Sequence, residues 1–389
     1  MALPLSYNLR NLLVRWKVTL LAIFGIGLVV MVFVILLAMA SGFRLSLAAT
    51  GSDANGIVVQ RGSGSELTSW INSENGNLIV VDPRVAHDAG GQPLASREIV
   101  VVANLPKRDS RDPTNVTIRG VTPVAFKVRS GIRITQGRNF TTGLSEVIVG
   151  ERIQRRIAGL DLGATVKLQR RDWQVVGVFS AEGGAFESEI WGDFDVMGPA
   201  FLRRGGQNSL TLRLADPATL PAFDTELQAN RQMQVRMVSE RQYYEDQSAP
   251  VSRPLMALAW FVSIVMGIGA VFGAMNTMYA IVVARTKEIG TLRALGFSRR
   301  SILVSFMIES LILALVGGAV GCLLAFPMNG FATGTGNTAG FAEIAFAFRL
   351  TPQDLAFGLA FALVMGFLGG LLPAVRASRL PITAALREA

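Results

Sequence analysis

The stretch ARTKEIGTLRALGFSRR, residues 284–300, decides how this chain is organised. It is rich in Arg and Lys, and it lies between two long apolar runs at residues 255–283 and 302–329. Each run is long enough to cross about 30 Å of hydrocarbon as a helix. The stretch is therefore expected to lie at a membrane face between two spans, where it cannot shift without moving both.

The same stretch carries the pattern of a short amphipathic helix. Ile289, Leu292 and Leu295 recur at intervals of three, and the charged side chains fall elsewhere around the helix. Gly296 is expected to end this helix in the left-handed conformation, and Ser298 is expected to cap the helix that follows. An ordinary charged connector that only sets topology is the alternative interpretation.

Two further apolar runs, at residues 18–40 and 355–372, bring the expected number of membrane spans to four. The net charge of +9 is concentrated in three short segments, 1–17, 284–300 and 373–389. The positive-inside rule then places both termini and the 284–300 segment on the cytoplasmic side of the membrane. Residues 1–17 are expected to form an amphipathic helix on the inner face, and 373–389 a cytosolic tail. Because topology explains the basic charge, we infer no nucleic-acid partner.

Residues 41–254 contain no comparable apolar run and are expected to form a large extracytoplasmic α/β domain. A β-rich insertion is predicted around residues 121–206, and a short outer loop at 331–354. Predicted strands include residues 57–60, 78–81, 98–102, 116–121, 146–150, 209–214 and 234–237, with a hairpin over 165–179. Helices are predicted at 151–158, 218–230 and 240–247.

The sequence lacks the residue types that several kinds of catalytic and metal site require. The sequence has one Cys and one His, so neither a metal site ligated by these residues nor catalysis built on them is expected. It contains no P-loop and no Gly-x-Ser-x-Gly elbow, so we assign no catalytic residues and no cofactor to the chain itself. Four acidic residues surround Trp191, and a solvated loop is expected there rather than a cation or protein site. They are Glu187, Glu189, Asp193 and Asp195.

The 284–300 stretch resembles the signature of the MacB/FtsX family of ABC transporter permeases, which reads roughly ERTREIGILRALGA followed by a basic pair. The similarity continues through the Gly-rich run 317–321 and the ending LPAVRASR at 372–379. The order of one span, a large domain and three spans also fits, although Ala284 replaces the family's first carboxylate. The resemblance implies a MacB-like periplasmic core in the α/β domain.

The resemblance also implies partners. Two copies of a separate cytosolic ABC ATPase would supply ATP and Mg, and would receive the 284–300 segment as a coupling helix. The residues that would form this docking segment are Arg285, Lys287, Glu288, Ile289, Leu292, Arg293 and Leu295. A second permease would complete a homodimer or heterodimer in the lipid bilayer. A periplasmic adaptor and an outer-membrane channel often accompany such proteins.

Two sets of membrane residues remain to be assigned. Glu309 lies inside the third span, where it is either a switch or proton carrier or a structural carboxylate bonded to a neighbouring hydroxyl, amide or basic residue. Four glycines are expected to allow close helix packing, within the chain or across a dimer seam: Gly269, Gly273, Gly317 and Gly321.

Two functions follow from the resemblance. The first is a permease subunit that passes ATP-driven motion to the outer domain for export or envelope delivery. The second is a mechanotransmitter that moves no cargo and activates an envelope enzyme such as a cell-wall hydrolase.

Overall fold

The computed structural model describes residues 14, 16–110, 112–334 and 345–381. Most of the predicted N-terminal helix at 1–17 and part of the predicted tail at 373–389 lie outside these ranges. The chain divides into two compact units. The helical unit comprises residues 1–42, 251–331 and 348–389, and the α/β unit comprises 43–250 and 332–347.

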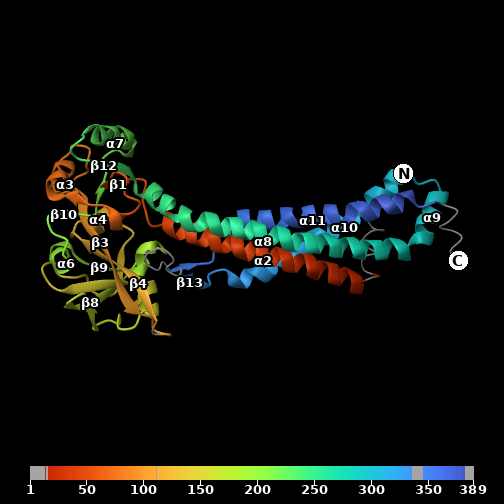
Figure 1. Cartoon of the computed structure of the whole chain (residues 1–389), viewed down its shortest axis with the longest axis horizontal. Helices are drawn as coiled ribbons and strands as arrows, with labels where there is room; N and C mark the ends of the chain where they lie inside the picture. The colour runs from red at the N-terminus through yellow and green to blue at the C-terminus, as the bar shows by residue number, and fades with distance from the viewer. Residues whose placement is uncertain (1–13, 15, 111, 335–344, 382–389) are drawn as a thin grey trace. The chain divides into compact units, whose positions relative to one another are not determined.

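Four helices are long and apolar enough to cross a membrane among the described residues (Figure 1). They are α2 (Trp16–Ala48), α8 (Glu240–Ala284), α10 (Arg299–Ala325) and α11 (Pro352–Arg379). Three of them extend beyond the predicted apolar run at both ends, whereas α10 begins three residues before its run of 302–329 and ends four residues before the end of that run. The predicted separate helix at 240–247 is instead the first part of α8, which continues through Pro250 and Pro254.

Close backbone approach holds the helices of the helical unit together. A Cβ added at Gly321 of α10 would lie 2.5 Å from the Gly27 carbonyl oxygen of α2, and one at Gly366 of α11 would lie 2.3 Å from the Ala314 Cβ. Only glycine fits at such distances, because a real side chain would push the two backbones apart. Apolar clusters around Val30 and around Phe306 fill the rest of the interior.

The α/β unit is built on one ten-stranded mixed sheet, in the order β12-β1-β11-β3-β4-β9-β6-β8-β5 with β7 beside β8. The strands are β1 (Asn55–Gln60), β3 (Ala95–Pro106), β4 (Pro113–Val121), β5 (Arg133–Gly137), β6 (Glu146–Gly150), β7 (Thr165–Leu168), β8 (Arg171–Ser180), β9 (Glu189–Asp193), β11 (Ser209–Arg213) and β12 (Val235–Ser239). Two small ribbons pair β2 (Ile71–Asn72) with β10 (Gly206–Gln207), and β13 (Ala332–Gly334) with β14 (Ala345–Ala347). The helices are α3 (Ser73–Val80), α4 (Ala125–Val128), α5 (Glu151–Arg156), α6 (Phe194–Ala200) and α7 (Leu220–Ala229).

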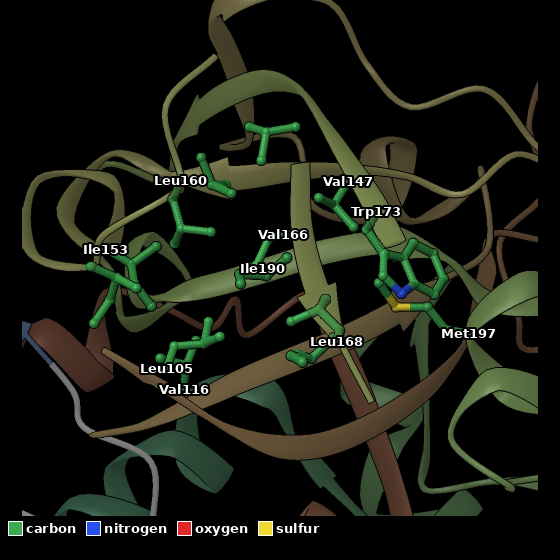
Figure 2. Close-up of a cluster of buried hydrophobic side chains, with 14 of the residues drawn as sticks. Leu105, Val116, Val147, Ile153, Leu160, Val166, Leu168, Trp173, Ile190 and Met197 are labelled. Atoms are coloured by element: carbon green, nitrogen blue, oxygen red, sulfur yellow. The ribbon is translucent and has the colours of Figure 1, made fainter. Parts of the chain in front are cut away.

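The strands of the predicted insertion form one half of this sheet rather than a separate body. β9 pairs in parallel with β4, which joins strands β5 to β9 to the half made of β1, β3, β4, β11 and β12. Each half has an apolar core. The core of the inserted half contains Trp173 and Ile190 of the sheet and Met197 of α6, and it continues to Leu105 and Val116 of β3 and β4 (Figure 2). The core of the other half contains Phe223 and Leu227 of α7.

One predicted strand of this unit is a helix instead. Residues 78–81 form the end of helix α3 and the residue after it, because the Asn72 side chain accepts a hydrogen bond from the Asn75 N–H and starts a helix there. The hairpin predicted over residues 165–179 is confirmed, and it turns between Leu168 and Arg171, with Gln169 at a φ of 56°. A left-handed residue in the turn matches the twist of the two strands.

Candidate functional site

The 284–300 stretch forms a short helix between two long ones. Helix α9 (Thr286–Ala294) begins directly after α8, and Ser298 caps α10 by accepting a hydrogen bond from the Ser301 N–H. Gly296 ends α9 with a φ of 92°, and the Phe297 N–H donates to the Leu292 carbonyl at 3.1 Å. The predicted order of helix, glycine stop and capped helix is confirmed.

Helix α9 has one face against its own chain and one face open. Ile289 is 1% exposed and packs in the apolar cluster of α8, α10 and α11. Leu292 and Arg293 are half-buried, and an Arg293 Nη1 donates to the Ser378 carbonyl of α11 at 3.3 Å. Lys287, Glu288 and Leu295 are exposed, and Leu295 is 70% exposed. Of the seven predicted docking residues, only these three present an open surface.

Arg285 belongs to the buried side of this segment. Its guanidinium donates to Glu309 Oε2 at 3.0 Å, and the two side chains are only 4% and 3% exposed. The Nε also donates to Glu288 Oε2 at 3.1 Å, and the guanidinium lies over the Phe306 ring at 5.1 Å. Pairing with a basic residue, one of the alternatives that the sequence left open for Glu309, is present in the structure.

The four predicted packing glycines fall into two pairs. Gly317 and Gly321 of α10 meet α2, where an added Cβ would lie 3.0 Å from Ile26 and 2.5 Å from Gly27. Gly269 and Gly273 of α8 have nothing within 4 Å of such a Cβ among the described residues. The first pair therefore serves packing within the chain. The second pair leaves a smooth surface on an exposed side of α8.

The α/β unit contains a buried network of charged side chains that the sequence did not predict. Arg119 of β4 contacts three carboxylates, from Glu66, Glu98 and Glu189, at 2.7–2.8 Å. Arg129 also pairs with Glu98, and it contacts Glu240, the first residue of α8, at 2.6 Å. The network therefore joins four carboxylates through two guanidinium groups.

Burial and charge compete in this network. Burial alone would raise the pKa of Glu66, but the positive charge of Arg119 and hydrogen bonds from Arg119 and Ser209 outweigh it, so that pKa is lowered. Burial likewise works against the charged form of Arg119, yet Glu189 and Glu66 raise its pKa well above the usual value. Both groups are therefore held in their charged forms.

The predicted solvated loop around Trp191 is wrong for three of its four acidic residues, and Asp195 alone of the four is exposed. Glu187, Glu189 and Asp193 are all buried in the segment that includes β9. Glu187 accepts hydrogen bonds from the Ala181 and Gly183 N–H groups, and Glu189 pairs with Arg119 and with the Trp191 indole. The described residues contain no group of His, Cys, Asp and Glu placed to hold a metal ion. These carboxylates serve the packing of the sheet.

A second charged pair lies at the start of β6. The hydrogen bond from Arg138 lowers the pKa of Glu146 to about 2, against the smaller opposing effect of burial. The two side chains form a two-point contact, at 2.5 and 2.7 Å, and the Thr141 N–H donates to the same carboxylate.

The helical unit and the mixed-sheet unit together define a polytopic membrane protein with a large α/β domain. Residues 19–230 match the model of the MacB-like periplasmic core domain, and residues 260–382 match that of the FtsX-like permease C-terminal region. The chain belongs to this family of MacB/FtsX-type ABC permeases.

Named relatives agree with this assignment. The chain is 28% identical to the macrolide export ATP-binding/permease protein MacB of Brucella abortus over 231 residues, which cover 57% of this chain and 34% of that protein. It is 26% identical to the ABC transporter permease YknZ of Bacillus subtilis over 296 residues, or 72% of each chain. The chain thus spans about a third of the length of the Brucella relative.

Two solved structures align with about half of the chain. The periplasmic region of MacB from Actinobacillus actinomycetemcomitans aligns with a TM-score of 0.39 at 14% identity, covering 50% of this chain and 92% of that one. The extracellular domain of the transporter YknZ aligns with a TM-score of 0.36 at 16% identity, covering 48% of this chain and all of that one.

Proposed function

We propose that this chain is the permease subunit of an ABC transporter that passes ATP-driven motion from a separate cytosolic ATPase to its α/β domain. The observation that carries the proposal is the two-sided environment of α9. One face, with Ile289, is packed into the helical unit, and the other, with Leu295, is open. A helix anchored on one side and free on the other can receive a partner and move the bundle with it.

The open face supplies the contacts for the ATPase. Leu295 offers an apolar side chain to a groove, and Lys287 and Glu288 offer charges of both signs at its edge. A central apolar anchor with a polar rim is the usual arrangement of a protein interface. ATP and Mg bind the partner, and the ATPase is present in two copies, one for each permease of a homodimer or related heterodimer.

The substrate side of the proposal rests on the α/β domain. One relative is named for macrolide export, and we propose export or envelope delivery of a substrate as the activity of this chain too. The chain would lie in the bacterial inner membrane with both termini in the cytoplasm and the α/β domain outside, as the distribution of Lys and Arg predicts. A periplasmic adaptor and an outer-membrane channel are the further partners proposed.

The docking face can be tested by one substitution and a matched control. Leu295→Asp places a charge at the centre of the open face and should reduce co-elution of an ABC ATPase, co-expressed from the neighbouring genes, by about tenfold or more. Leu202→Asp, on an 89% exposed leucine of the α/β unit, should leave co-elution unchanged. Equal co-elution of both variants would reject the docking face. Ile289→Asp is unsuitable, because it would disrupt the interior of the bundle.

Co-purification decides between transport and the non-transporting alternative. Recovery of an adaptor protein with the ATPase-bound complex would support export. Recovery of a cell-wall hydrolase would instead assign the chain to the control of an envelope enzyme.

A further inference from the structure

We infer that Arg285 is a positioning residue rather than a docking residue: with Glu309 it locks the junction of α8 and α9 onto α10. The role of this ion pair in the cycle rests on the proposed function, because the pair passes motion of α9 to the other helices only if an ATPase moves α9. The lock itself concerns only this chain and can be tested without any ATPase.

The contacts of Arg285 carry the first step. It is the single residue between α8 and α9, and the Ile289 N–H donates to its carbonyl at 2.9 Å, so its backbone begins α9. Its side chain is buried and pairs with Glu309 of α10 at 3.0 Å, while its Nε also donates to Glu288 of α9 at 3.1 Å. A single side chain thus ties three helices at one point.

The surroundings of the pair carry the second step. Phe306 lies against the guanidinium, and the neighbouring cluster includes Ile289 and Ile302. In such an apolar setting, separating the two charges costs a large amount of free energy, since water does not take the place of the partner that is lost. The pair is therefore expected to stay intact while α9 is pushed, so that α9 and the first half of α10 move together.

The position of Glu309 along α10 explains how the ion pair affects the other helices of the bundle. The helix that carries Glu309 also carries Gly317 and Gly321, which touch α2, and Gly318, where an added Cβ would lie 2.7 Å from the Ala362 Cβ of α11. A displacement delivered at Glu309 therefore reaches α2 and α11 through close backbone contacts. Arg285 is the element that converts a push on α9 into movement of α10.

The test measures the chain alone in nanodiscs by amide hydrogen exchange. Arg285→Gln and Glu309→Gln should each reduce protection of the α9 amides by about a hundredfold, the factor expected when a buried ion pair is broken. Lys287→Gln, a change at an exposed neighbouring cation, is the matched control and should leave protection unchanged. The charge reversal Arg285→Glu with Glu309→Arg should restore most of the protection that either single change removes. If α9 protection in both single variants equals that of the control, the lock does not exist.

Coupling is read separately in the complex with the ATPase. Arg285→Gln should retain the ATPase as well as the wild type does, while ATP-dependent movement of a spin label on α10 is lost and ATP hydrolysis continues. Release of the ATPase by Arg285→Gln to the extent seen with Leu295→Asp would return Arg285 to the docking face and overturn the inference. If the wild-type chain binds no ATPase, the proposed function fails, and the exchange experiment still decides whether the pair locks α9.

Discussion

Replacing Arg119 with Met should destabilise the α/β domain more than any surface substitution, because this guanidinium neutralises most of a buried acidic network. Arg119 contacts Glu66, Glu98 and Glu189, whose side chains are at most 10% exposed. Without it, Arg129 is the one remaining guanidinium among four carboxylates. Methionine fills a similar volume, so the loss of stability measures the missing charge and hydrogen bonds rather than the cost of a cavity.

The magnitude follows from the burial of the partners. Removing one member of a buried ion pair costs about 3–5 kcal/mol, because the other charge is left without a partner in a medium that solvates it poorly. Here three carboxylates lose a partner, so the lower end of that range is a minimum. For a domain of this size, about 3–5 kcal/mol corresponds to a decrease in melting temperature of about 6–20 °C.

The assay is thermal unfolding of the full chain in detergent, followed by tryptophan fluorescence, since Trp191 lies beside the network and donates to Glu189 at 2.7 Å. Arg108→Met is the control. Arg108 pairs with Asp161 at 2.8 Å, but the side chains are 42% and 63% exposed, so its loss should cost no more than about 1 kcal/mol. A decrease for Arg119→Met no larger than that of the control would refute the claim that the network is buried and intact.

Four further outcomes are expected. The pKa of Glu146 is lowered from 4.5 to about 2 in the folded state, so its carboxylate stabilises the fold above pH 4.5 and loses this contribution as the pH falls toward 2. In the Glu146→Gln variant, the stability to unfolding should therefore depend less on pH between 4.5 and 2. Thermal unfolding should show that Gly321→Ala destabilises the helical unit by about 1–3 kcal/mol, because the added methyl group would collide with α2. Gly273→Ala, the control on an open side of α8, should leave the fold intact. If the Gly273 variant no longer dimerises, that side of α8 is the contact with the second permease. In a background without Cys322, a cysteine at Leu202 should react with a membrane-impermeant reagent only from outside the cell, and reaction from the cytosol would overturn the proposed topology. The purified chain should hydrolyse no ATP, and turnover that co-purifies with it through successive columns would contradict the need for a separate ATPase.

The features that the sequence predicts well are those set by neighbouring residues. Membrane helices follow from the length of apolar runs, and the end of α9 follows from a glycine that takes a positive φ followed by a serine that caps the next helix. The strand at Glu146–Gly150 is local in the same sense, because a short β-branched run between polar residues specifies it. The family signature is local too, since it lies in one continuous stretch.

The buried network could not be predicted in this way, because its members are far apart in the sequence. Arg119 and Glu189 lie 70 residues apart and meet only because β4 and β9 are parallel neighbours. Read along the chain, Glu189 belongs to an acidic segment, which is typical of a solvated loop. A parallel pairing between distant strands has no local signal, so neither the partner nor the burial of this carboxylate was accessible.

The burial of Arg285 was not predicted for a different reason, which bears on how the whole membrane segment works. A basic residue in a charged stretch between two spans is usually exposed, and the periodicity of Ile289 and Leu292 defines an apolar face without saying what covers it. The structure covers Ile289 with the chain's own helices, so Leu295 is left as the apolar residue available to a partner. Glu309, a carboxylate inside a predicted membrane span, was the signal in the sequence that an arginine of this stretch turns inward, because a buried charge is stabilised by an opposite one. The proposed docking face and the buried Arg285–Glu309 pair thus involve different residues, and substitutions in the two should fail in different ways. A change in the proposed docking face should release the ATPase, whereas a change in the pair should leave the ATPase bound but without effect on the helices.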